Sequence, residues 1–287
     1  MKSGSGYPPP VINSMRSRAL PIAVVIFGVL FLGALAVFAI AGGSSLTDPA
    51  DILTRGAEAT SEADSFHVSL TVAGSIDDPE TGSSMLLDGV AVEGDVDLAN
   101  EAAHVTFAVP FLLGLSGEVI VLGEDVYVMS SLSGDKWIHT PATSEISPSP
   151  GPSSPAEIAD KVNEFLATEG VSAEKLADEE CGEDTCYHVR LTISEDALAA
   201  HPDAMPDMGD YGSFLPDDAF SGPVLVDLLF DRDGLWLRQV STTAADPESG
   251  DASLTMTLSQ YNKTFEISAP LADQVTEEGD FPLFPTY

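Results

Sequence analysis

The stretch Ser65-Phe66-His67-Val68-Ser69-Leu70-Thr71-Val72 decides the fold class, because apolar and polar residues alternate along it without interruption. Successive side chains of a β-strand point to opposite faces, so this alternation predicts a strand with one apolar and one polar face. The same pattern returns in residues 90–98, 105–109, 187–193, 224–230 and 254–258. Turn-forming sequences such as Asp231-Arg232-Asp233-Gly234 separate the segments, which predicts antiparallel strands joined by hairpins.

Two helices are predicted beside these strands. Residues 48–63 carry a weak apolar stripe and begin at a capping residue, Thr47 or Asp48, and residues 155–168 begin after Ser154. The chain is therefore mainly β with a few helices, an α+β protein. A sheet with one apolar face must bury that face, and two helices are too few to cover roughly nine or ten strands. A barrel and an incompletely covered open sheet both leave room for an apolar cavity, whereas a filled core without a cavity is the alternative.

The predicted cavity takes its lining from the apolar side of the strands. Alternation gives these candidates, although a slip of one residue in pairing would turn a whole strand outward: Phe66, Leu70, Val72, Val92, Val105, Phe107 and Val121. The irregular apolar stretch 109–115 holds three candidates for the mouth of the pocket, or for a buried hairpin corner, namely Phe111, Leu112 and Leu113. Residues 201–222 form a long loop that is either a lid or disordered.

The N-terminal part of the sequence predicts a membrane anchor. Residues 19–41 contain no charge and are long enough to cross a bilayer as one helix. The charges before them are all positive, so residues 1–18 are expected to be a cytoplasmic tail, with the main domain outside the cytoplasm. Cleavage after Ala41 as a signal peptide stays open as an alternative. No cysteine follows the apolar run, so lipid attachment there is not expected.

The charge balance limits the partners. Three of the 11 basic residues precede residue 42, and the rest of the chain has eight basic and 46 acidic residues. Such a surface excludes nucleic acid and anionic headgroups as electrostatic partners, because both need Lys and Arg. We expect residues 42–47 to be a linker, 48–270 the extracytoplasmic domain and 271–287 a C-terminal tail.

Cys181 and Cys186 lie between two strand-like runs. Two nearby cysteines in an oxidising compartment most often pair, so we predict a disulfide across a hairpin. A redox motif would have the spacing Cys-x-x-Cys, and a zinc site would need two more ligands.

No catalytic constellation is visible in the sequence. There is no Gly-x-Ser-x-Gly, and the histidines are scattered; His67, His104 and His188 fall on the polar side of their strands. The Asp-rich stretch 201–210 matches no ligand spacing for calcium. We therefore expect no enzyme activity, no metal and no cofactor.

The order of the elements resembles a known family. The pattern comprises a helix from Asp51-Ile52-Leu53, Asp125-Val126-Tyr127-Val128 followed by Lys136-Trp137, a second helix, Cys186-Tyr187-His188-Val189, Asp233-Gly234-Leu235-Trp236-Leu237 and Met256-Thr257-Leu258-Ser259-Gln260-Tyr261-Asn262. It is similar to the LprG/LppX-type envelope lipoproteins, which share a fold with the LolA/LolB carriers. The resemblance covers residues 48–270.

The resemblance implies a curved antiparallel half-barrel sheet wrapped around helices, with a hydrophobic pocket between them. It implies an acylated lipid or glycolipid as ligand, carried within the cell envelope. This chain departs from the family by having an apolar helix in place of the lipidated cysteine, which favours binding over long-range ferrying. The alternative is a sensor or interaction domain of the RseB type, which contacts an envelope protein partner.

Overall fold

The computed structural model describes residues 46–78, 83–111, 113–131, 134, 136–141, 155–194, 196–197, 223–246 and 250–277. Within them the chain forms one 14-stranded open sheet and two helices, α2 (Pro49–Ser61) and α3 (Pro155–Leu166). The strands are β1 (Ser65–Asp78), β2 (Ser83–Leu86), β3 (Val90–Asp97), β4 (Ala102–Val109), β5 (Leu115–Leu122), β6 (Asp125–Ser130), β7 (Trp137–Pro141), β8 (Val171–Lys175), β9 (Glu179–Cys181), β10 (Asp184–Ile193), β11 (Val224–Asp231), β12 (Leu237–Asp246), β13 (Gly250–Ser259) and β14 (Val275–Glu277).

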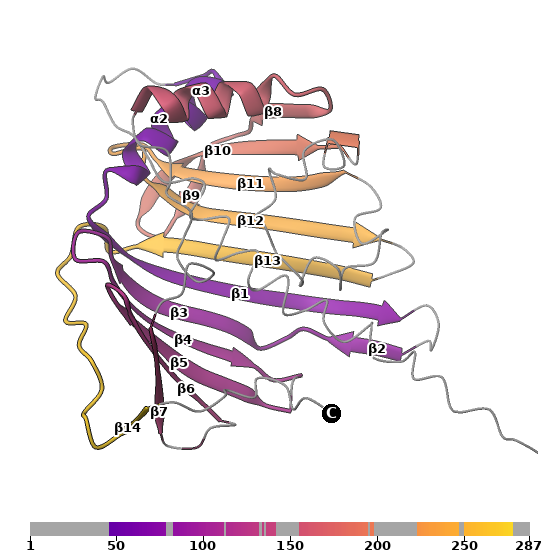
Figure 1. Ribbon diagram of the computed structural model, residues 1–287. Coiled ribbons are helices and arrows are strands. Elements are labelled where there is room, and N and C mark those ends of the chain that lie inside the picture. Colours follow the sequence, from indigo (N-terminus) through magenta and orange to yellow (C-terminus); the bar gives the residue numbers. More distant parts are fainter. Residues whose placement is uncertain are drawn as a thin grey trace, which may run out of the picture.

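The sheet curves, and its two helices lie near one edge (Figure 1). The strand order is β14-β7-β6-β5-β4-β3-β1-β13-β12-β11-β10-β8, with β2 paired to β1 and β9 to β10. Every pairing is antiparallel except that of β14 with β7. The mainly β, open and curved architecture with two helices confirms the predicted fold class.

Helix α2 starts where its cap predicts. Asp48 has extended backbone angles, and its side chain accepts a hydrogen bond from the Ala50 N–H at 2.9 Å. The helix packs against α3, β8, β10 and β12. It lies close to the sheet at Gly56, where a Cβ atom would overlap the ring of Phe230. The absence of a side chain at this position therefore sets how near α2 lies to β11.

The main core lies between α2 and five adjacent strands of the sheet, which are β1, β13, β12, β11 and β10. Its largest fully buried side chains include Ile52 from α2, Leu70 from β1 and Leu228 from β11. Val162, Phe165 and Leu166 of α3 are only partly buried against it. Two helices thus close one half of the sheet, as hydrophobic burial demands.

The sequence placed a C-terminal tail from residue 271 onwards, but the structure adds a strand there. Val275 pairs with Trp137, and the N–H of Trp137 donates to the carbonyl of Gln274 at 2.9 Å. The sheet therefore extends beyond residue 270. At the other end of the chain, residues 19–41 lie outside the described residues, and among the described helices none is long and apolar enough to cross a membrane.

Candidate functional site

The candidate site is the inner face of the sheet, which the strand register builds row by row. Side chains that face each other across an antiparallel pair lie on the same face. Leu70 pairs with Val92, which pairs with Phe107. Phe66 pairs with Val96, and the row continues through Ala103 to Val121. All seven pocket candidates therefore lie on one face.

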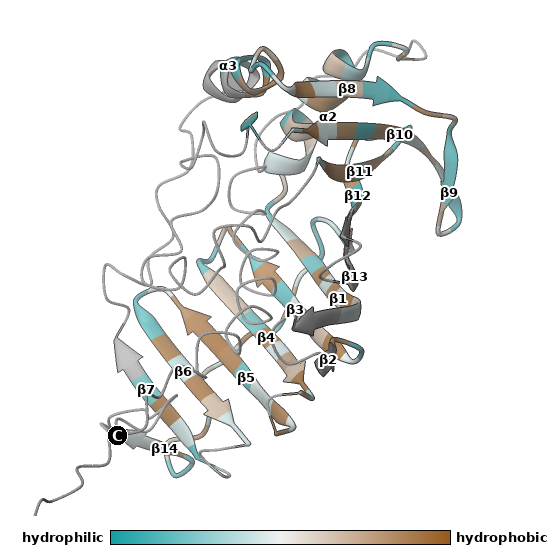
Figure 2. Cartoon of the chain, turned by 90° about the vertical axis from the view of Figure 1, so that its right-hand side faces the viewer, coloured by the Kyte–Doolittle hydropathy of each residue, from teal (hydrophilic) through white to brown (hydrophobic). Residues whose placement is uncertain are grey.

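Along the paired stretches 66–72 of β1, 90–96 of β3, 103–109 of β4, 115–121 of β5 and 126–130 of β6, the inward positions carry no charged side chain. Ser130 is the one polar residue among the inward positions of those strands, which the register gives as Phe66, Val68, Leu70, Val72, Val90, Val92, Gly94, Val96, Ala103, Val105, Phe107, Val109, Leu115, Gly117, Val119, Val121, Val126, Val128 and Ser130. Figure 2 shows long apolar bands on β5 and β6. A surface of this kind can bind hydrocarbon, whereas a charged group buried against it would lack a partner.

Burial divides the seven candidates into two groups. Leu70, Val72 and Val92 are buried in the core beneath the helical half. Phe66, Val105 and Phe107 are half-buried and pack against that core, and Val121 is half-buried further from it. The exposed part of the apolar face therefore lies towards β4 and β5, away from α2.

The sequence missed three inward residues of this exposed part. Val105 pairs with Val119, Val119 with Val128, and Val128 with Ile138, so one apolar row crosses from β4 to β7. All three missed side chains, Val119, Val128 and Ile138, are half-buried. The signal of Val119 was weak because β5 also carries apolar residues on its outer side, which hides the alternation.

Two glycines shape the inner face. A Cβ on Gly117 would lie 2.7 Å from Cζ of Phe107, so the Phe107 ring reaches across to strand β5. A Cβ on Gly94 would lie 2.8 Å from Cα of Val105. Larger residues at either position would displace side chains of β4, so the two glycines allow Val105 and Phe107 to occupy their observed positions.

The predicted mouth lies in the β4–β5 loop. Phe111 is partly buried against the core, and Leu113 is 99% exposed with a φ of 56°. Leu112 lies outside the described residues. The loop thus combines an anchored and a protruding apolar residue; that it forms the mouth of a pocket stays a prediction. The candidate lid, residues 201–222, also lies outside the described residues.

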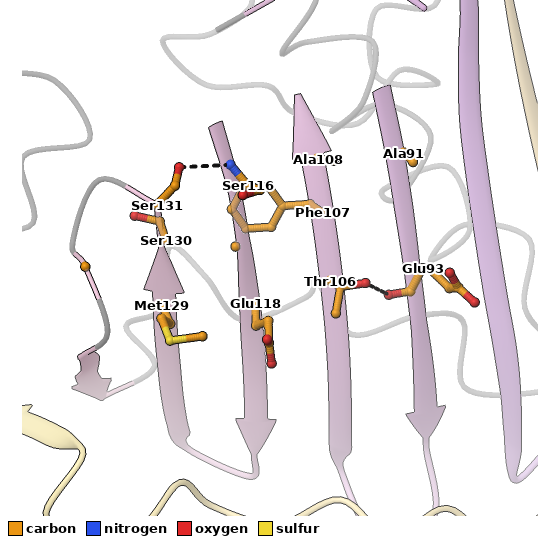
Figure 3. A pocket seen from close by; sticks show the side chains of 12 residues that line it. Ala91, Glu93, Thr106, Phe107, Ala108, Ser116, Glu118, Met129, Ser130 and Ser131 are labelled. Atoms are coloured by element: carbon orange, nitrogen blue, oxygen red, sulfur yellow. Dashed lines mark hydrogen bonds between the residues drawn. The ribbon is translucent and has the colours of Figure 1, made fainter. Parts of the chain in front are cut away.

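A hollow of about 480 Å³ lies on the opposite, polar face of β3, β4, β5 and β6 (Figure 3). Its lining includes Glu93, Thr106, Glu118 and Met129, whose positions alternate with the inward ones. The Thr106 hydroxyl donates to the carbonyl of Glu93 at 3.1 Å. Most of the lining thus belongs to the polar face, and Phe107, Gly117 and Ser130 of the apolar face also border the hollow. The sequence did not predict this hollow.

Four histidines occupy the same polar face, each beside a carboxylate. His67 lies 2.7 Å from Asp95, and His104 lies 3.1 Å from Glu118. His188 lies 2.8 Å from Asp227, and His139 lies 2.8 Å from Asp125. The predicted placement of His67, His104 and His188 on the polar side is correct, and their carboxylate partners were not foreseen. Among the described residues no cluster has the composition of a metal site.

Asp227 also binds Arg190 through two hydrogen bonds of 2.8 and 3.0 Å. Burial raises the pKa of Asp227, but the hydrogen bonds from Arg190 and His188 outweigh burial and hold the pKa below its ordinary value. This cluster joins β10 to β11 on the polar face. Its geometry is that of a structural ion pair.

A second hollow, of about 390 Å³, lies where β12 begins and β13 ends, next to Trp236, Arg238 and Lys263. Trp236 packs on Tyr261 with ring centroids 4.3 Å apart, and Tyr261 donates a hydrogen bond to the carbonyl of Leu237. Burial raises the pKa of the Tyr261 phenol. These contacts fasten the end of β13 to the start of β12.

The two cysteines are bonded to each other, as predicted. Cys181 ends β9, Cys186 lies in β10, and their Cα atoms are 5.9 Å apart. The two strands form a hairpin in which Cys186 pairs with Glu179. The bond therefore staples a hairpin and is remote from the exposed apolar face.

Solved structures with a similar architecture include two mycobacterial proteins. The lipoprotein LppX of Mycobacterium tuberculosis is 16% identical, with 76% of this chain and 97% of that chain covered at a TM-score of 0.46. LprF of Mycobacterium bovis is 17% identical, with coverages of 79% and 99% and a TM-score of 0.47. LppX is one of the proteins that name the family in the sequence analysis.

A third solved structure, MucB in complex with MucA, is 14% identical, covering 79% of this chain and 58% of that chain at a TM-score of 0.32. No family model matches the chain, and no curated protein matches it.

Proposed function

We propose that the protein is a lipid-binding protein of the cell envelope that holds acyl chains against the inner face of its sheet. The observation that carries the proposal is the register, which brings together the inward side chains of the paired stretches 66–72, 90–96, 103–109, 115–121 and 126–130 without a charged group. Hydrocarbon binds such a surface because water leaves both partners.

In this proposal the ligand lies on the half-buried residues of the inner face. Phe66, Val105 and Phe107 border the main core, and Val119, Val128 and Ile138 continue the face towards β7. The described helices pack on the other half of the sheet, where α2 contacts β8, β10 and β12. An acyl chain on these residues would complete the apolar layer that α2 begins.

The proposed setting is the outer side of a membrane, with residues 19–41 as a single-pass anchor and residues 1–18 in the cytoplasm. Support comes from the uncharged run and the positive charges before it. An anchored protein can pass a lipid to a neighbour, so local transfer is the proposed role. The ligand class, an acylated lipid or glycolipid, follows from the apolar face and the family resemblance.

Native mass spectrometry of the full chain, released from membranes in a mild detergent, tests the proposal. We expect bound lipid species that organic extraction removes and added acylated lipid restores. A chain that carries no lipid and takes up none contradicts the proposal, and binding to an envelope protein would then be the function to test.

A further inference from the structure

The loops at one end of the sheet place two leucine side chains in solvent. Leu113, in the β4–β5 loop, is 99% exposed, and Leu86, at the end of β2, is 66% exposed. We name these two residues the leucine tip. Nearby apolar residues of the same two loops are not exposed in this way: Leu87 is buried, and Phe111 packs against the core.

The two loops lie close together. A Cβ on Gly89, two residues after Leu87 in the β2–β3 turn, would lie 3.1 Å from Cγ of Pro110. Gly114 closes the other loop by donating its N–H to the carbonyl of Pro110 at 2.9 Å. Pro110 therefore joins the loops, and both leucines project from the same end of the sheet.

Leu113 has a backbone conformation that leucine rarely adopts. Its φ of 56° lies in the left-handed region, which is unfavourable for a residue with a Cβ. A single exposed apolar residue is ordinary on a protein surface. Leu86 is exposed at the same end of the sheet, and together the two leucines offer an apolar contact there.

We infer that the leucine tip inserts into a lipid surface without net negative charge. The inference rests on the proposed function and names the contact through which lipid reaches the inner face. The tip is continuous with that face, because Val109 and Leu115, on either side of the loop, form its last paired row. A lipid chain leaving a bilayer at the tip would meet apolar side chains without a break.

Charge selects the kind of surface. No Lys or Arg occurs between Arg55 and Lys136, so neither loop of the tip has a basic residue. The loop after Leu86 instead has an acidic residue, Asp88. A polybasic segment is what draws proteins to anionic lipid. The tip has only apolar insertion available, and anionic headgroups would repel this acidic chain.

Tryptophan fluorescence in brominated lipid tests the insertion. The full chain carrying Leu113→Trp is reconstituted in phosphatidylcholine vesicles with bromine on the acyl chains, either as host bilayer or as added vesicles. Since interfacial insertion reaches 5–10 Å, we expect about twofold lower added emission than in ordinary phosphatidylcholine. Emission of the wild-type chain, which has Trp137 and Trp236, is subtracted.

Leu98→Trp is the matched control, because Leu98 is 46% exposed in the turn at the opposite end of β4. Its emission should not respond to bromine, whereas Leu86→Trp should behave like Leu113→Trp. Absence of quenching at both tip positions, in both vesicle arrangements, overturns the inference. So does quenching that increases when phosphatidylglycerol replaces part of the phosphatidylcholine.

Bound lipid is measured by mass spectrometry on the same preparation. Bound lipid with an unquenched tip overturns the leucine tip alone, and the proposed function stands. A quenched tip on a chain that never carries lipid contradicts the proposed function, and the tip is then a membrane contact of another kind.

Discussion

At the scale of single residues, Gly56 is the contact that sets the distance between α2 and the sheet. We predict that Gly56→Ala destabilises the protein by about 1–3 kcal/mol, because the added methyl group overlaps the buried Phe230 ring. Higher helix propensity of alanine would oppose this by up to about 1 kcal/mol. Chemical denaturation followed by circular dichroism measures the free energy of unfolding.

Thr54→Ala is the control, since Thr54 lies on the same helix and is only half-buried. It should change the free energy of unfolding by less than about 0.5 kcal/mol. If Gly56→Ala proved as stable as Thr54→Ala, the close packing of α2 on Phe230 would be wrong.

Asp227 is a residue whose charge supports the fold. Its pKa is lower in the folded protein than in the unfolded chain, because its hydrogen bonds with Arg190 and His188 outweigh the opposing effect of burial. The unfolded chain therefore binds the proton more tightly, and the contribution of Asp227 to stability is present above the unfolded pKa of about 3.9. It is lost as the pH falls through that value towards the folded pKa.

We predict that Asp227→Asn lowers the stability by about 1 kcal/mol at pH 7 and by much less at pH 3. The pair is partly exposed, and for that reason the expected loss is small. Thermal unfolding at the two pH values provides the comparison. Equal losses at pH 7 and pH 3 would argue against an ionised Asp227 as the source.

At the scale of the elements, the β9–β10 hairpin depends on its disulfide. A six-residue ring stabilises the fold by about 2 kcal/mol through the lost entropy of the unfolded chain. The double substitution Cys181→Ser and Cys186→Ser should lower stability by about that amount. Reduction of the wild-type chain should give the same loss, and the inner-face lipid should remain bound. A free-thiol assay on unfolded, unreduced protein should find no free thiol, because the sequence contains only these two cysteines.

Strand β14 shows what a sequence pattern leaves out. It has three residues, too few for a period, and its pairing with β7 is parallel and comes after an extended segment. β12 was hidden for another reason, because its two faces differ little in polarity. Its inward positions Val240, Thr242 and Ala244 alternate with Ser241, Thr243 and Ala245, so the pattern that predicted β1 and β10 is weak there.

A chain ending before Val275 tests whether β14 protects the edge of β7. Without it, Trp137 loses the strand beside it and the polar groups of β7 face solvent. We predict a lower melting temperature and concentration-dependent association by light scattering. A truncated chain that stays monomeric with an unchanged melting temperature would show that β14 is dispensable.

At the scale of the whole molecule, the sequence predicted the fold class, the polar and apolar strand faces and most strands. It left open whether neighbouring strands share a register. The pairing of Leu70 with Val92 and of Val92 with Phe107 answers that question for the candidate face. The register depends on turn geometry and on glycines such as Gly94 and Gly117, which a single-strand pattern does not contain.

The central question for the whole molecule is whether the inner face around Val105 receives lipid or is a filled core. Val105 is half-buried and borders the core, and its neighbour Gly94 adds no side chain. A larger apolar residue there keeps the face uncharged and only takes up space. The effect of such a change on lipid and on stability therefore differs between the two cases.

We predict that Val105→Trp removes the bound lipid and leaves the melting temperature unchanged, because the indole occupies the volume of the acyl chain. Native mass spectrometry and thermal unfolding of the same preparation measure both quantities. Thr106→Trp, exposed on the polar face one residue further along β4, is the control and should keep the lipid. In a filled core, Val105→Trp would instead overpack the site and cost about 1–3 kcal/mol in a chain that never held lipid. That result would contradict the proposed ligand site and leave the apolar face as structure alone.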